Sequence, residues 1–134
     1  KTDPRLAHWA ARGEKLALHD YLAAERARMD IGAAFKALLD DYDILVTPTT
    51  AMTAFDAGSN MPKDAQGRPW EDWTPFTYGA NLARLPAASI PAGLSAAGLP
   101  VGLQIMAGYL KDVLVLQAAH ALEQKIAFDG WSMT

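Results

Sequence analysis

Cysteine is absent from the sequence, which excludes disulfides, thiolate zinc sites and cysteine nucleophiles. Long hydrophobic runs are absent as well, and no apolar stretch approaches the ~18 residues that a membrane-spanning helix needs. Positive charge is not in excess, because the net charge is −3 and the basic residues are scattered. These absences argue against nucleic acid and membranes as partners, and we expect a cytoplasmic protein.

The composition is that of a folded chain. Of 134 residues, 51% are hydrophobic and 20% are charged, which is typical of globular rather than disordered proteins. A chain of this length can bury roughly two-thirds of the surface that it exposes when unfolded. Because it begins with Lys1 and not with Met, we expect the natural start to lie upstream.

Three segments have helical character. Pro4 suits a first helical turn capped by Asp3, and the pattern predicts a short helix that ends at Gly13. Residues 18–41 are rich in Ala, Leu, Glu and Arg and predict a long helix, whose apolar stripe changes side midway. Asp112 is expected to cap a last helix that reaches about residue 126.

The remaining elements are short. We predict strands over 44–46, stopped by Pro48, over 88–90 between two prolines, and over 101–107. A short helix over 77–83 and a long loop over 58–75 lie between the first two strands. The order of elements predicts a layered α/β arrangement. Three short strands cannot form a well-covered sheet alone, because typical sheets have ~5–6 strands.

Catalytic and metal-binding patterns are missing from the sequence. No serine lies in a Gly-x-Ser-x-Gly turn, and we interpret Ser89, inside a predicted strand, as structural. The three histidines lack metal-ligand spacing, and the acidic cluster at residues 40–43 is interpreted as a solvated helix end. The residues alone therefore indicate an α/β chain with an aromatic-rich loop, without naming a reaction.

Two segments resemble a known family. The first is Tyr-Asp-Ile-Leu-Val-Thr-Pro-Thr at residues 42–49. The second, over residues 76–108, contains Asn-Leu-Ala-Arg-Leu-Pro-Ala-Ala-Ser-Ile-Pro-Ala-Gly and then Gly-Leu-Pro-Val-Gly-Leu-Gln. Each motif is weak alone, but their order and spacing are similar to those of the amidase signature family. One position departs from the family pattern, because Arg84 stands where the family usually has Gly, a residue suited to turns with positive φ.

The resemblance implies that residues 1–134 are the C-terminal fragment of an amidase-type domain, part of an α/β/α sandwich with a mixed sheet. Members of the family hydrolyse carboxylic amides with a serine nucleophile, a second serine in a cis peptide and a lysine base. Those motifs are not in this chain, so no catalytic residue, metal or cofactor is assigned to it. We expect the isolated chain to be inactive and, with uncovered strand edges and apolar faces, to self-associate, for example through strand exchange.

The expected ligand of the full-length protein is a small-molecule amide. We predict that the segment from Trp70 to Asn81 lines the mouth of the substrate pocket, with four residues in contact with substrate: Trp73, Phe76, Thr77 and Asn81. The absence of Arg and Lys from this segment favours an apolar or aromatic substrate. The structural alternative is that the rings only cap the core. Two other functions stay open: part of the A component of a glutamine-using amidotransferase, and a non-catalytic binding or assembly module on this scaffold.

Overall fold

The computed structural model describes residues 4–70 and 73–126. The elements follow one another as α1 (Pro4–Gly13), α2 (Leu18–Asp41), β1 (Ile44–Pro48), α3 (Pro75–Ala83), β2 (Ala87–Leu94), β3 (Pro100–Ala107) and α4 (Asp112–Ile126). The predicted bounds of α2 are confirmed, and those of β1, β3 and α4 agree to within one or two residues. The proposed cap at Asp3 lies outside the described residues.

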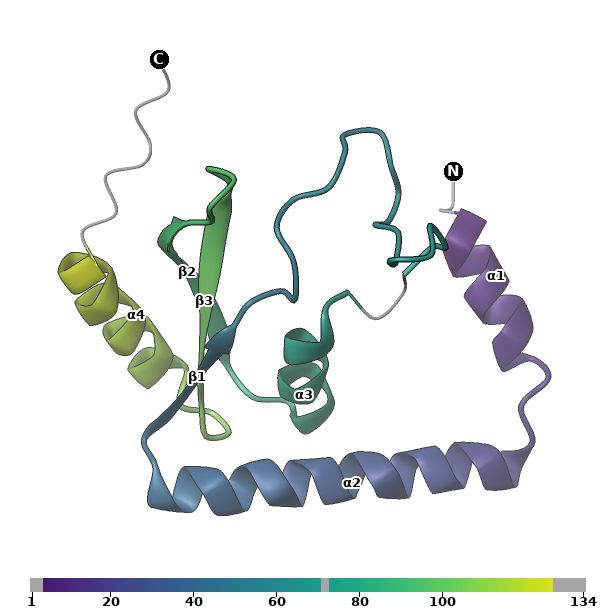
Figure 1. Cartoon of the computed structure of the whole chain (residues 1–134). Coiled ribbons are helices and arrows are strands. Elements are labelled where there is room, and N and C mark those ends of the chain that lie inside the picture. The colour runs from purple at the N-terminus through teal and green to yellow at the C-terminus, as the bar shows by residue number, and fades with distance from the viewer. Residues whose placement is uncertain (1–3, 71–72, 127–134) are drawn as a thin grey trace.

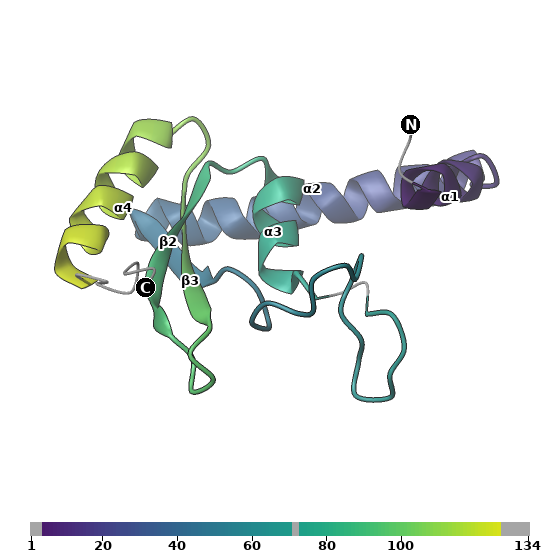
Figure 2. The same ribbon diagram turned by 90° about the horizontal axis from the view of Figure 1, so that it is seen from above.

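The three strands form one sheet in the order β1-β3-β2, and both pairings are antiparallel. The last strand along the chain is therefore the central one. In Figures 1 and 2, α4 covers one face of the sheet and α3 lies on the other side, next to the long helix α2. This three-layer arrangement confirms the α/β/α class expected from the sequence.

The prediction for β2 was wrong at its end. We expected Pro91 to stop the strand, yet β2 continues to Leu94. Proline lacks an N–H and is tolerated in edge strands or at irregular positions. Both conditions hold here, because β2 is an edge strand and its register with β3 shifts between Pro91 and Leu94. The strand accommodates the proline by breaking its regular pairing there.

The core lies between the sheet and α4. Ile105 is fully buried, and Ile90 and Ala119 pack with it. The predicted inner face of α4 is confirmed, because Val115 and Ala119 are buried and the later residues Leu122 and Ile126 pack against the same cluster. These contacts hold one face of the sheet against α4. The opposite face of the sheet carries polar side chains.

The long helix α2 is mostly exposed. Leu39 is its one buried residue, and the helix touches α3 through Phe35, whose ring lies where a side chain on Gly79 would be. A Cβ atom at Gly79 would come within 2.7 Å of the Phe35 Cζ atom. A second contact joins the helices, since the Arg28 Nε donates to the Leu82 carbonyl at 3.1 Å. These two contacts dock α3 onto the middle of α2.

In its described part, residues 49–70 and 73–74, the segment between β1 and α3 is a loop that contains one short turn, whereas residues 71 and 72 of the predicted loop lie outside the described residues. A single bridge pairs Lys63 with Pro69. Within this turn the Asp64 carboxylate accepts hydrogen bonds from the Gln66 and Arg68 N–H groups and from the Arg68 Nε. The Arg68 N–H and guanidinium lower the pKa of Asp64, with the Gln66 N–H contributing and desolvation opposing.

Candidate functional site

The sheet face opposite α4 carries polar residues from all three strands. Thr47 of β1 and Ser89 of β2 both pair with Gln104 of β3. Directly paired residues project to the same side of a sheet, and the period of two along a strand adds Gly102 to that side. Each of these residues belongs to one of the motifs that resemble the amidase signature family. The fold thus brings three separate motifs together on one face, which we call the polar face.

A glycine leaves room for two hydroxyls at the polar face. Thr49 and Ser89 share a hydrogen bond of 2.6 Å across β3, and the Thr49 N–H donates to the Gly102 carbonyl at 3.0 Å. A Cβ atom on Gly102 would lie 2.7 Å from the Thr49 Oγ1 and 2.9 Å from the Ser89 Oγ. Close approach of side chains therefore requires glycine here. Ser89 is paired with a hydroxyl and not with a base, which supports its structural interpretation.

Gln104 connects the polar face to α3. Its side chain is buried, with 5% of its surface exposed. The Nε2 donates to the Thr47 Oγ1 at 3.0 Å and to the Phe76 carbonyl at 2.9 Å. A buried amide has few alternative partners, so these bonds determine where the first turn of α3 sits relative to the sheet. Gln104 thereby positions the end of the aromatic loop.

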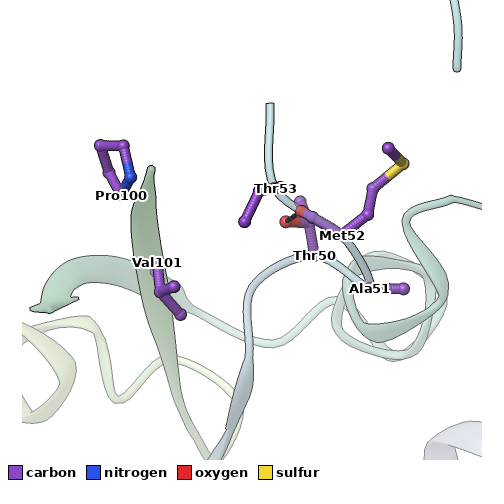
Figure 3. Close-up of a pocket in the computed structure, with 7 residues that line it drawn as sticks. Thr50, Ala51, Met52, Thr53, Pro100 and Val101 are labelled. Atoms are coloured by element: carbon purple, nitrogen blue, oxygen red, sulfur yellow. Dashed lines mark hydrogen bonds between the residues drawn. The ribbon is translucent and has the colours of Figure 1, made fainter. Parts of the chain in front are cut away.

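A cavity of about 210 Å³ opens beside the polar face. Its walls are residues 50–53, which follow β1, and Pro100, Val101 and Gly102 of β3 (Figure 3). None of these lining residues carries a charge. Complete small-molecule sites measure about 300–1,000 Å³, so this cavity has the size of a partial site with neutral, hydroxyl-bearing and apolar walls.

None of the four predicted substrate residues lines this cavity. Trp73 is half-buried, stacks edge-on against Phe55 at 5.4 Å, and its carbonyl accepts a hydrogen bond of 3.3 Å from the N–H of Ala51 in the cavity wall. Phe76 is 37% exposed, and its carbonyl accepts a hydrogen bond from the Gln104 Nε2. Of the four, Trp73 is thus the one that bonds directly to the wall.

The other two predicted residues make local contacts within α3. The Thr77 Oγ1 donates to the Thr74 carbonyl at 3.0 Å, and the Asn81 Nδ2 donates to the Thr77 carbonyl at 2.7 Å. Both bonds stay within the helix and its first turn, and Asn81 is exposed. Their contact with a substrate remains a prediction.

The sequence reasoning missed the cavity walls. Residues 50–53 directly follow the Thr-Pro-Thr motif, and residues 100–102 belong to the Gly-Leu-Pro-Val-Gly motif. A signal was therefore available, because segments flanking two family-like motifs were candidates for one site. What was missing was the register of β1 against β3, which brings the two segments together.

Arg84 adopts the conformation that glycine usually supplies. Its φ and ψ are 56° and 40°, in the left-handed region. Its N–H donates to the Asn81 carbonyl at 3.2 Å, and the Leu85 N–H donates to the Ala80 carbonyl at 2.9 Å, a pattern that ends many helices. The positive φ suspected at this position is confirmed, and in this chain an arginine adopts it.

The described residues hold no cluster of metal-type ligands. Among residues 4–70 and 73–126, no group of three His, Asp or Glu side chains is arranged to bind an ion. His19 lies 3.1 Å from the Asp20 carboxylate, but both side chains are largely exposed. In the same residues, no helix is both long and apolar enough to cross a membrane.

Comparison with known proteins identifies the family. The Amidase family model matches residues 1–116, and the chain belongs to this family of amidase signature enzymes. It is 42% identical over 110 residues to the glutamyl-tRNA(Gln) amidotransferase A subunit of Brevibacillus brevis, a match that covers 82% of this chain and 22% of that protein. It is 38% identical to the corresponding protein of Halothermothrix orenii, over 79% of this chain and 21% of that protein.

Solved structures agree with this assignment. A bacterial aryl acylamidase of the amidase signature family superimposes with a TM-score of 0.77 at 28% identity, over 98% of this chain and 27% of that one. The glutamyl-tRNA(Gln) amidotransferase A subunit of Thermotoga maritima gives a TM-score of 0.70 at 34% identity, over 90% of this chain and 25% of that one. The chain spans about a fifth of the length of the curated relatives that it matches.

Proposed function

We propose that this chain is the C-terminal part of a cytoplasmic amidase that hydrolyses carboxylic amide C–N bonds. The observation that carries the proposal is the polar face, where the three family motifs meet next to a neutral cavity. In this proposal a serine, a cis serine and a lysine outside these 134 residues form and break the acyl-enzyme. The amine or ammonia leaves first, and water then attacks the acyl group.

The role proposed for this chain is to shape the substrate site. The cavity beside Gly102 accepts an uncharged group, because its walls offer hydroxyls and apolar surface without an ionic partner. Trp73 is joined to that wall by the hydrogen bond from Ala51 to its carbonyl, and Phe76 follows at the start of α3. We infer that these rings, with Thr77 and Asn81, form the mouth of the site and favour neutral apolar or aromatic amides.

Substitutions in the full-length enzyme test the role of the rings. Trp73→Ala and Phe76→Ala are expected to lower kcat/KM unequally across amides whose acyl groups differ in size, with little change in Tm. Tyr109→Ala is the matched control, because it removes a ring that is 65% exposed in the turn before α4 and absent from the cavity wall. If both variants lose stability and all substrates suffer equally, the rings belong to the core and the pocket lies elsewhere.

The isolated chain tests the assignment of catalysis to other residues. Ser89 is hydrogen-bonded to Thr49, and the Ser95 Oγ accepts the Leu99 N–H, so neither serine is paired with a base in the described part of the chain. We expect the purified 134-residue chain to show no amide hydrolysis. Hydrolysis by this chain that a serine-directed inhibitor abolishes would overturn the proposal.

A second candidate function is part of the A component of a glutamine-dependent amidotransferase. The observation that favours it is the 42% identity to the Brevibacillus brevis protein of that kind. Such a protein would act together with other subunits. Ammonia release by the full-length protein separates the two functions: a strong preference for glutamine supports the amidotransferase, whereas comparable or faster release from simple amides supports the amidase.

A further inference from the structure

The wall segment of the cavity, residues 50–53, is anchored to the sheet by the residue that precedes it. The Thr49 N–H donates to the Gly102 carbonyl at 3.0 Å, and the Thr49 Oγ1 shares a hydrogen bond of 2.6 Å with the Ser89 Oγ. Gly102 belongs to the other wall of the cavity, which is formed by residues 100–102. Thr49 therefore connects one wall of the cavity to the other and, through its hydroxyl, to β2.

The Thr49–Ser89 bond lies where the backbone pairing of the sheet ends or becomes irregular. On one side of β3, β1 ends at Pro48, directly before Thr49. On the other side, β2 loses its regular register with β3 between Pro91 and Leu94, shortly after Ser89. The strand order β1-β3-β2 leaves β1 and β2 without direct pairing, so the hydroxyl pair joins two strands that the backbone does not connect.

The two hydroxyls depend on each other and on a glycine between them. Their oxygen atoms are 2.6 Å apart, at the short end of the range for O–H···O hydrogen bonds. They meet over Gly102, where a Cβ atom would lie 2.7 Å from the Thr49 Oγ1 and 2.9 Å from the Ser89 Oγ. Among residues 4–70 and 73–126, neither hydroxyl has a second hydrogen-bond partner. Removing either hydroxyl therefore breaks the same contact.

The rest of the wall segment is fixed by contacts that do not involve the sheet. The Ala51 N–H donates to the Trp73 carbonyl at 3.3 Å, and the Thr50 Oγ1 donates to the Met52 carbonyl at 2.8 Å. These bonds remain when the hydroxyl pair is removed. Loss of that pair is therefore expected to loosen the wall segment at its start, as a small displacement and not as unfolding.

We propose that Ser89 is a positioning residue, which acts through Thr49 to fix residues 50–53 and thereby the size of the acyl group that the enzyme selects. The inference rests on the proposed function, because it takes the cavity as part of the substrate site. In an apolar pocket, the fit of a single methylene group changes kcat/KM by roughly tenfold or more. A small shift of this wall should therefore change substrate selection, whereas an exposed hydrogen bond contributes little to folding.

Steady-state kinetics of the full-length enzyme test the proposal with simple amides whose acyl group lengthens by single methylene groups. Ser89→Ala should shift the ratio of kcat/KM values toward longer acyl groups by about threefold to tenfold, because the loosened wall leaves more room. The change should lie mainly in KM, since the wall contacts the bound acyl group and not the bond that is cleaved. Tm should change little, because the Ser89 side chain is exposed.

A double-mutant cycle tests whether Ser89 acts through Thr49. Thr49→Val removes the same bond and should give the same shift in selection, and the double variant with Ser89→Ala should be no more affected than either single variant. Thr49→Ser keeps a hydroxyl and should retain the selection of the wild-type enzyme. Ser59→Ala is the matched control, because it removes the hydroxyl of an exposed serine outside the cavity wall, and it should leave selection unchanged.

Hydrogen exchange of the full-length enzyme measures the anchoring of the wall without reference to catalysis. Ser89→Ala should accelerate exchange of the backbone amides at residues 49–53, because the segment opens more readily when the hydroxyl pair is lost. Thr49→Ser should leave these exchange rates close to those of the wild-type enzyme. The amide of fully buried Ile105 in β3 is the internal reference, and its exchange should not change in either variant.

The possible failures are distinguishable. Unchanged exchange at residues 49–53 in Ser89→Ala would overturn the positioning role and leave the proposed amidase function standing. Faster exchange with unchanged selection would overturn the role in substrate selection, because the acyl group would then not contact this wall. An equal loss of kcat/KM for all acyl groups together with a lower Tm would reduce the bond to a contribution to stability. A wild-type enzyme that hydrolyses no simple amide would overturn both proposals.

Discussion

Replacing Arg84 with glycine should give a more stable chain than replacing it with alanine. Arg84 ends α3 with φ of 56° and ψ of 40°, a conformation that costs an L-residue roughly 1–2 kcal/mol. Glycine avoids this cost but loses about 0.5–1 kcal/mol through its greater freedom in the unfolded chain. We therefore expect the free energy of unfolding of Arg84→Gly to exceed that of Arg84→Ala by about 0.5–1 kcal/mol. For a chain of this size that difference raises Tm by roughly 2–4 °C.

The comparison with alanine isolates the backbone effect. Both variants remove the guanidinium, which interacts favourably with the carbonyl end of a helix, so that contribution cancels between them. Ala37→Gly provides the control, because Ala37 is exposed in the interior of α2 and glycine there should cost about 1 kcal/mol. Urea denaturation of the three variants measures the values. An Arg84→Gly variant less stable than Arg84→Ala would refute the left-handed turn.

Three further predictions concern packing, a buried hydrogen bond and pH. Gly79→Ala should lower the free energy of unfolding by about 1–3 kcal/mol, because the new methyl overlaps the Phe35 ring, and Phe35→Leu in that background should recover part of the loss in urea titrations. Gln104→Leu should lower the free energy of unfolding by about 1–3 kcal/mol, because it leaves the Phe76 carbonyl unpaired. Hydrogen exchange of the amides in the first turn of α3 should then accelerate. Unchanged exchange rates would contradict the role of Gln104 in positioning α3. The folded chain lowers the pKa of Asp64 from its ordinary value of 3.8. The stabilisation of the turn by the Asp64 carboxylate should therefore be complete above pH 3.8 and be lost as the pH falls through the lower folded pKa. An NMR titration that gives Asp64 a pKa at or above 3.8 would disprove this prediction.

Local patterns were sufficient to predict most of the helices and strands. The bounds of α2 follow from residues 18–41, which are rich in Ala, Leu, Glu and Arg and precede the β-branched segment after Asp43. The end of β2 was mispredicted because a proline stops a strand only where its N–H is needed for pairing. That need depends on the neighbouring strand and its register, which a single segment does not contain.

The site was harder to predict, because it depends on contacts between distant segments. Thr47, Ser89 and Gln104 were recognised as parts of separate motifs, but their meeting on one face follows from the order β1-β3-β2. The same pairing forms the cavity wall from residues 50–53 and 100–102. Composition drew attention to the aromatic loop instead, and of the four substrate residues predicted there, Trp73 is the one that bonds directly to that wall.

The central position of β3 has a consequence for how the chain folds. Val46 pairs with Ile105, and Ala88 pairs with the same residue from the other side. Neither β1 nor β2 can pair until β3 has left the ribosome, and closing the long loop back to β1 is entropically costly. During synthesis, the backbone groups of β1 therefore remain unpaired until β3 is made, whereas α2 can already form from local contacts. Formation of the sheet is accordingly expected to be the slow step of folding, and the interval before it is when the nascent chain is most open to mispairing or to binding by a chaperone.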